Sequence, residues 1–148
     1  MDATGPYLQR IDMRGGAWFA GQAIHVAGSP EFLRRRVLDL LRAEARRRLS
    51  TLVAEKTALA GLHARRVTVK DTISRWGSCA PDGSLAFSWR LVMAPGFIQD
   101  YVAAHEVAHL RHMNHGPRFW ALVRTLARQM DSAVAWLRDE GQRLMRIG

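Results

Sequence analysis

Four histidines and one glutamate fall within eleven consecutive residues of this chain, the segment HEVAHLRHMNH at 105–115. Six apolar residues surround the first two histidines: Val102, Ala103, Ala104, Val107, Ala108 and Leu110. This pattern predicts a substantially buried helix, and a buried imidazole without a partner is costly. The fold must therefore give these side chains partners, and that requirement limits the arrangements that the chain can adopt.

Two of these histidines have the spacing of metal ligands. His105 and His109 are four residues apart, so on a helix their side chains share one face, about 40° apart in projection. Two such imidazoles can converge on one ion at about 2.0–2.1 Å. Glu106 lies about 100° round the helix, where it could reach a water on that ion without being a ligand. The pattern H-E-x-x-H is typical of zinc-dependent hydrolases. The alternative, three ordinary helix residues, conflicts with the burial that the flanking residues indicate.

A zinc site of this kind needs a third protein ligand besides an open position. His115 follows His109 by six residues, which is the metzincin spacing, in which the chain leaves the helix and the third imidazole swings back. Asn114 tolerates a left-handed backbone, and Gly116-Pro117 can end one helix and start the next. This local sequence favours His115 as the third ligand.

Two other residues compete with His115 for that role. Glu140 is the only glutamate after Glu106, and it would give a thermolysin-type site. His112 lies about 10.5 Å along a helix axis from His105, so three ligands in one straight row would be too far apart to converge at about 2 Å each. We therefore predict His115 as the third ligand and exclude His112.

The composition narrows the kinds of site and partner. Cys79 is the only cysteine, so the metal must be held by histidine or carboxylate. The formal charge of +9 comes from 22 basic residues, of which only Lys56 and Lys70 are lysines. This charge favours weak attraction to nucleic acid or another polyanion; the alternative is that the arginines are simply solvated. Because no apolar stretch approaches about 18 residues and the N-terminal residues lack a signal-like apolar run, we expect a cytoplasmic protein without membrane association.

The remaining pattern predicts an α+β fold. Ser29, Pro30 and Gly61 bracket a helix over about 30–60 that has one apolar face. Alternation with a period of two predicts strands at 65–71 and 84–92, and the turn Pro81-Asp82-Gly83 predicts that they form an antiparallel hairpin. The other expected elements are a strand pair within 17–26 and helices over 95–113, 117–130 and 131–145, the last capped by Asp131 or Ser132.

Four segments together resemble a known family. They are SRWGSC at 74–79, LAFSWRLVMAP at 85–95, DYVAAHEVAHL at 100–110 and NHGPRFW at 114–120. In combination they are similar to the YgjP-like metal-dependent hydrolases, zincin-fold proteins distantly similar to the SprT and WLM-type metalloproteases. The resemblance covers about residues 17–140. The chain departs from the family pattern at Gly116, where serine is usual, and at Ser88, where asparagine is usual.

The resemblance implies a zincin-like fold in which a small antiparallel or mixed sheet packs against an active-site helix. It implies one domain over residues 1–148, with abbreviated N-terminal strands within 1–28. One Zn²⁺ held by His105, His109 and His115, Glu106 as catalytic acid/base, and a peptide or protein substrate are the expectations for the site. The rival hypotheses are a nucleic-acid-associated protein with a structural metal and a hydrolase of non-peptide amides or esters.

Several residues around this site keep two interpretations. In SRWGSC, Arg75 or Ser78 could contact substrate, or Trp76 could fill the core while Gly77 permits a close backbone approach. The oxyanion could be stabilised by any of three candidates: Tyr101, Arg75 and His112. Phe119, Trp120 and Cys79 are expected to be core residues. An edge strand near 84–92 could hold an extended peptide.

Overall fold

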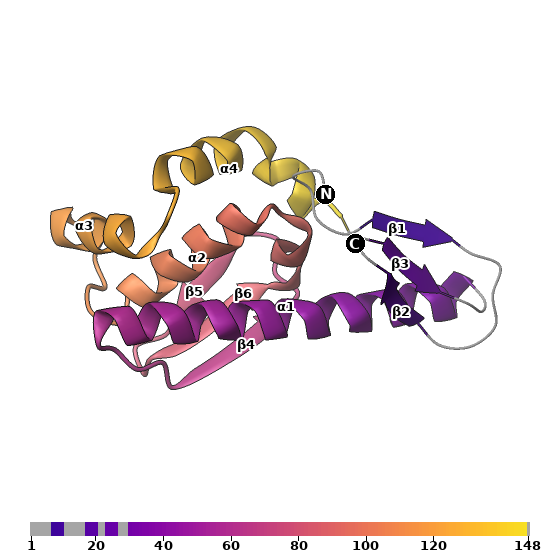
Figure 1. Cartoon of the computed structure of the whole chain (residues 1–148), viewed down its shortest axis with the longest axis horizontal. Helices are drawn as coiled ribbons and strands as arrows, with labels where there is room; N and C mark the ends of the chain where they lie inside the picture. Colours follow the sequence, from indigo (N-terminus) through magenta and orange to yellow (C-terminus); the bar gives the residue numbers. More distant parts are fainter. Residues whose placement is uncertain (1–6, 11–16, 21–22, 27–29, 148) are drawn as a thin grey trace.

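The computed structural model describes residues 7–10, 17–20, 23–26 and 30–147, with side chains from residue 30 onward (Figure 1). The described residues form four α-helices, one 3₁₀ helix and two three-stranded sheets, which confirms the predicted α+β class. The elements are β1 (Tyr7–Arg10), β2 (Ala17–Ala20), β3 (Ala23–Val26), α1 (Pro30–Ala60), β4 (Arg66–Lys70), β5 (Gly77–Cys79), β6 (Ser84–Ser88), η1 (Trp89–Met93), α2 (Gly96–Ala108), α3 (Pro117–Leu126) and α4 (Met130–Met145).

The long helix α1 packs against elements of both sheets and against α2. Its apolar face recurs every four residues, and the buried residues on it are Val37, Leu41, Ala45, Leu49 and Val53. The first sheet lies beside the N-terminal part of α1, whereas the second sheet and α2 pack against its C-terminal part (Figure 1). The predicted bounds of 30–60 are confirmed, and Gly61 ends the helix with a φ of +67°. The predicted cap Ser29 lies outside the described residues.

The first sheet has the order β1-β3-β2. The predicted strand pair within 17–26 is confirmed as the antiparallel pair of β2 and β3. β1 pairs with β3 in parallel and was not predicted.

The second sheet has the order β4-β6-β5, and the predicted hairpin of 65–71 with 84–92 is wrong. β4 pairs with β6 in parallel, and the antiparallel partner of β6 is β5. The predicted turn is present, with Gly83 at a φ of +89° and Ser84 N donating to Asp82 Oδ1 at 2.9 Å. The turn joins β5 to β6. β5 was not predicted, because a three-residue strand that includes Gly77 is too short to show alternation in the sequence.

The second predicted strand also ends earlier than 92. β6 stops at Ser88, whose Oγ accepts a hydrogen bond from Arg90 N at 3.3 Å and donates to the Thr72 carbonyl at 3.2 Å. The apolar alternation continues through Trp89 and Leu91, but these residues lie in the 3₁₀ helix η1. β6 is thus the central strand, so the predicted edge strand near 84–92 is wrong; the edges of this sheet are β4 and β5.

The helix α2 ends at Ala108, five residues before the predicted end at Met113. Its last turn tightens, because His109 N donates to the Glu106 carbonyl at 3.2 Å and Arg111 N to the Ala108 carbonyl at 3.1 Å. The chain therefore leaves the helix immediately after the H-E-x-x-H segment. As predicted, Pro117 starts the next helix after Gly116.

The two last helices differ from prediction at their junction. α3 stops at Leu126, because Arg128 N donates to Asp100 Oδ2 at 2.9 Å, which takes the chain off a helical path. α4 starts at Met130 after Gln129, so the predicted caps at Asp131 or Ser132 are wrong. The Asp131 carboxylate instead pairs with Arg124 on α3 at 3.1 Å.

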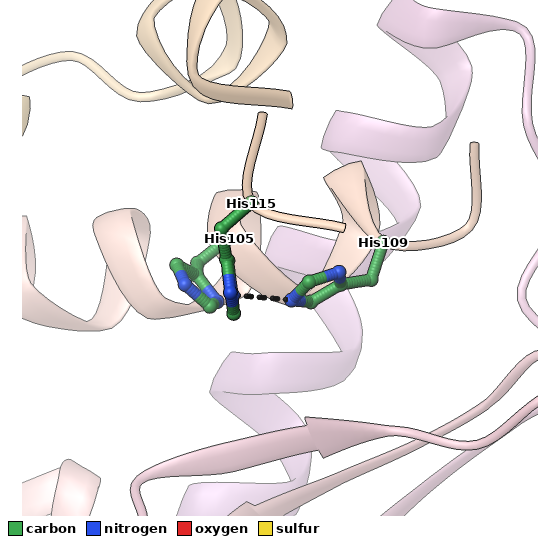
Figure 2. A group of neighbouring side chains, drawn as sticks. All are labelled: His105, His109 and His115. Carbon is green, nitrogen blue, oxygen red and sulfur yellow. Dashed lines mark hydrogen bonds between the residues drawn. The ribbon is translucent and has the colours of Figure 1, made fainter. Parts of the chain in front are cut away.

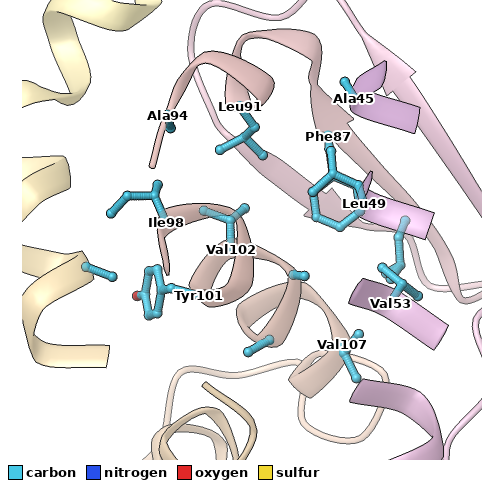
Figure 3. Close-up of a cluster of buried hydrophobic side chains, with 14 of the residues drawn as sticks. Ala45, Leu49, Val53, Phe87, Leu91, Ala94, Ile98, Tyr101, Val102 and Val107 are labelled. Atoms are coloured by element: carbon cyan, nitrogen blue, oxygen red, sulfur yellow. The ribbon is translucent and has the colours of Figure 1, made fainter. Parts of the chain in front are cut away.

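The core lies between α1, the second sheet and α2. Leu49 and Val53 of α1 face Phe87 of β6 and Val102 and Val107 of α2 (Figure 3). All five residues are at most 3% exposed. This packing fixes the position of α2, the helix that carries the histidines. None of the helices in the described part of the chain is both long and apolar enough to cross a membrane.

Candidate metal centre

The fold brings three histidines together. His105 comes from the last turn of α2, His109 from its C-cap, and His115 from the turn before α3. One ring nitrogen of each lies within 4.8 Å of the other two, and their rings point toward one another (Figure 2). Within residues 30–147 this is the one group of three or more histidines, cysteines or carboxylates with such spacing.

The donor set fits a divalent metal ion. Nε2 of His109 and Nε2 of His115 are 3.0 Å apart. Ligands of a tetrahedral zinc ion at about 2.0–2.1 Å lie about 3.3–3.4 Å from one another, so small side-chain rotations would bring the three nitrogens to ligand geometry. Burial lowers the pKa of His109, and a neutral imidazole keeps the lone pair that a metal requires.

His112 contributes its backbone to this cluster. The Nδ1 of His109 lies 3.0 Å from the carbonyl oxygen of His112, which can only accept, so Nδ1 carries the proton. The lone pair of His109 is then on Nε2, which faces His115. The imidazole of His112 does not belong to the histidine group, and neither does Glu140, which lies 3.5 Å from Arg143.

Glu106 lies beside the histidines and is 5% exposed. Its Oε2 is 2.9 Å from Nδ1 of His105. Gly77 of β5 lies against this carboxylate: a Cβ at position 77 would be 2.8 Å from Cγ of Glu106 and 3.2 Å from its Oε2. The close backbone approach expected at Gly77 is therefore present, and it is made to Glu106. The sequence analysis identified Glu106 but did not predict this contact.

Trp76, next to Gly77 in SRWGSC, packs on the core as the structural interpretation expects. Trp76 is partly buried against the core and lies beside Gly141 of α4, whereas Arg75 is exposed. Burial raises the pKa of the Cys79 thiol, and the charges of Glu106 and Asp82 act in the same direction. A protonated, half-buried thiol fits the expected filler rather than a nucleophile.

The three oxyanion candidates are placed differently. Tyr101 is 7% exposed, and its ring centroid lies 6.0 Å from that of His105. Burial raises the pKa of Tyr101, which keeps the hydroxyl a donor. Arg75 is exposed, and His112 offers the cluster a carbonyl. Of the three, only Tyr101 presents a buried donor side chain next to a histidine of the group.

Phe119 and Trp120, expected as core residues, pack directly on the histidines. Phe119 is fully buried, and its ring centroid lies 4.4 Å from that of His109. Their contact with the histidines could have been predicted from the sequence, because both residues follow His115 closely and lie within one helical turn of Pro117.

Comparison with known families agrees with this geometry. The model of the YgjP-like metallopeptidase domain matches residues 10–140. Neither the curated proteins nor the solved structures give a match. The family match covers most of the chain, including both segments that supply the histidines. The chain therefore belongs to the YgjP-like metallopeptidase family.

Proposed function

We propose that this protein is a zinc-dependent peptidase in which His105, His109 and His115 hold one Zn²⁺ and Glu106 is the general base. The observation that carries the proposal is the convergence of three imidazoles from two separate segments. Three histidines form a known ligand set for catalytic zinc, which keeps its fourth position open. When bound, the ion would supply a Lewis acid for the scissile carbonyl and would lower the pKa of water toward about 7.

Glu106 is suited to move the proton in this reaction. Its carboxylate lies at the histidine cluster and is shielded from solvent, with Gly77 packed against it. We propose that it accepts the proton of the attacking water and passes it to the leaving amine. His105, whose Nδ1 contacts Glu106 Oε2, orients that carboxylate.

The strand β5 is the proposed place for an extended substrate. It pairs with β6 along one edge, and among the described strands nothing pairs with its other edge. Gly77 of this strand touches Glu106. A peptide added to β5 by backbone hydrogen bonds would therefore run past the general base.

The proposal is tested by metal analysis of the purified protein together with a peptide-library cleavage screen. The zinc-loaded protein should cleave peptides, and Glu106→Gln should keep its zinc while hydrolysis falls by about 10²–10⁴-fold. Full activity of Glu106→Gln would exclude the general-base role. Cleavage of small esters without any peptide cleavage would favour the non-peptide hydrolase instead.

We further propose weak, sequence-independent binding of polyanions such as nucleic acid by α1. Among its exposed arginines, Arg34, Arg35 and Arg46 have no acidic partner within the described residues, whereas Arg47 pairs with Glu44. Binding of this kind should weaken steeply between about 50 and 200 mM salt. Tight, sequence-selective binding by a zinc-loaded protein that hydrolyses nothing would favour a nucleic-acid-associated role with a structural metal.

A further inference from the structure

The first turn of α3 packs on all three histidines at once. The ring centroid of Phe119 lies 5.1 Å from that of His105, 4.4 Å from that of His109 and 4.9 Å from that of His115. Phe119 is fully buried. It therefore packs beneath all three imidazoles, and its replacement would disturb the core as well as the site.

Trp120 makes a more selective contact. Its ring stacks on His115, with centroids 5.8 Å apart and an interplanar angle of 26°. It also meets His105 edge to face, with centroids 5.7 Å apart. It packs edge to face on Phe119, at 4.9 Å. Trp120 is thus half-buried and lies against His115, the histidine supplied by the turn before α3.

The orientation of His115 depends on this aromatic contact, because the backbone of its own segment makes few hydrogen bonds that would fix it. His115 is exposed, and among the described residues none of the backbone amides of 113–115 donates a hydrogen bond. His105, in contrast, is held in the hydrogen-bonded turns of α2, and His109 by its bond to the His112 carbonyl. Within the described residues, the ring of His115 is held by Nε2 of His109 and by the aromatic contacts.

We propose that Trp120 is a positioning residue that holds His115 in the orientation needed to bind the metal. This inference rests on the proposed function, which assigns His115 as a ligand. Without the stack, the imidazole would have to be ordered each time an ion binds, and the ion would dissociate faster. Groups that orient a ligand contribute about 10–100-fold to metal affinity, and we expect an effect in that range here.

The experiment compares three variants of the full chain: Trp120→Leu, Trp120→Phe and Trp136→Leu. The last is the matched control, because Trp136 of α4 is half-buried and has no ring contact with the histidines in the described part of the chain. Affinity for Co²⁺ is measured by titration of its visible absorption, and the rate of Zn²⁺ release is measured with a chromogenic chelator. Thermal unfolding of the metal-free proteins reports general destabilisation.

Trp120→Leu should bind Co²⁺ about 10–100-fold more weakly and release Zn²⁺ faster. Trp120→Phe, which keeps an aromatic ring, should recover most of the affinity, and Trp136→Leu should bind as the wild type does. In a His115→Ala background, Trp120→Leu should lose most of its effect, because the two residues act through one contact.

Two results would overturn the inference: wild-type affinity in Trp120→Leu, or equal loss in Trp120→Leu and Trp136→Leu. The His115→Ala variant separates this failure from failure of the proposed function. If His115→Ala loses the metal while Trp120→Leu keeps it, only the positioning role is wrong. If His115→Ala itself keeps the metal, the ligand assignment is wrong and the inference falls with it.

Discussion

Helix α2 carries two polar clusters that differ in how their hydrogen-bonding groups are satisfied. In its N-terminal half, Asp100 is 4% exposed, and its Oδ1 lies 2.5 Å from Nζ of Lys56 on α1. Lys56 is 1% exposed. Arg128 completes this cluster, with its backbone N 2.9 Å from Oδ2 of Asp100 and its guanidinium 3.0 Å from Oδ1. Both carboxylate oxygens are therefore paired with donors from the same chain.

The second cluster, at the C-terminal end of α2, is not closed in this way. Nε2 of His109 and Nε2 of His115 face each other at 3.0 Å, and since Nδ1 of His109 carries that ring's proton in its bond to His112, Nε2 of His109 offers a lone pair. Three ring nitrogens converge where one external ion could satisfy them all. The contrast shows that burial of charge alone does not indicate a site: the Asp100 cluster ties α1, α2 and the α3–α4 junction together, whereas the histidine cluster could hold a metal ion.

Breaking the closed cluster should have the largest effect on stability. Asp100→Ala would remove the buried partner of the Lys56 ammonium and leave it only the half-exposed Glu55 at 3.2 Å; breaking a buried ion pair in this way costs about 3–5 kcal/mol. Denaturant unfolding of the metal-free protein measures this loss. Asp131→Ala is the control, because its pair with Arg124 is exposed and screened by solvent, so its removal should leave the free energy of unfolding close to that of the wild type. Equal effects of the two substitutions would contradict the claim that the buried cluster of Asp100, Lys56 and Arg128 stabilises the fold.

A smaller effect is expected where β5 meets the general base. Gly77→Ala would place a Cβ 2.8 Å from Cγ of Glu106, and relieving this overlap costs about 1–3 kcal/mol. Hydrolysis should fall because Glu106 is displaced, while zinc content should stay near that of the wild type. Gly96→Ala serves as the control, since nothing lies within 4 Å of a Cβ there. Unchanged activity of Gly77→Ala would show that the position of Glu106 is less restricted than the contact indicates.

The pH dependence of the metal-free protein should show the smallest effect. Burial lowers the pKa of His109 in the folded state, so the unfolded state binds a proton first as the pH falls below about 6.5. The contribution of neutral His109 to stability is therefore present above that pH and is lost as the pH falls through the folded pKa. Unfolding between pH 7.5 and 5 should be less steeply pH-dependent in His109→Gln than in the wild type, and identical profiles would argue against a buried neutral His109.

The comparison of the two clusters also explains what the sequence could predict. The histidine cluster lies within eleven residues, so local spacing was enough to propose His105, His109 and His115 together. Lys56 and Asp100 are 44 residues apart, and no local pattern signals their pairing. The contact of Gly77 with Glu106 is equally non-local.

Local periodicity succeeded for long elements and failed for short ones. The bounds of α1 were predictable because apolar residues recur at helical spacing along its 31 residues and because Pro30 and Gly61 mark its two ends. Strand β5 has only three residues, so its hairpin with β6 was assigned to β4 instead. The end of α2 was predicted too late, because the tightening of its last turn depends on backbone hydrogen bonds rather than on a change in residue type.

The central claim, that the open cluster is a metal site made by His105, His109 and His115, is tested most directly by zinc stoichiometry. Zinc per chain is measured by elemental analysis for the wild type, for alanine variants of these three histidines, and for His112→Ala and Glu140→Ala. The account predicts about one zinc per chain in the wild type, in His112→Ala and in Glu140→Ala, and loss of zinc at positions 105, 109 and 115. Loss in His112→Ala or Glu140→Ala with retention in His115→Ala would contradict it.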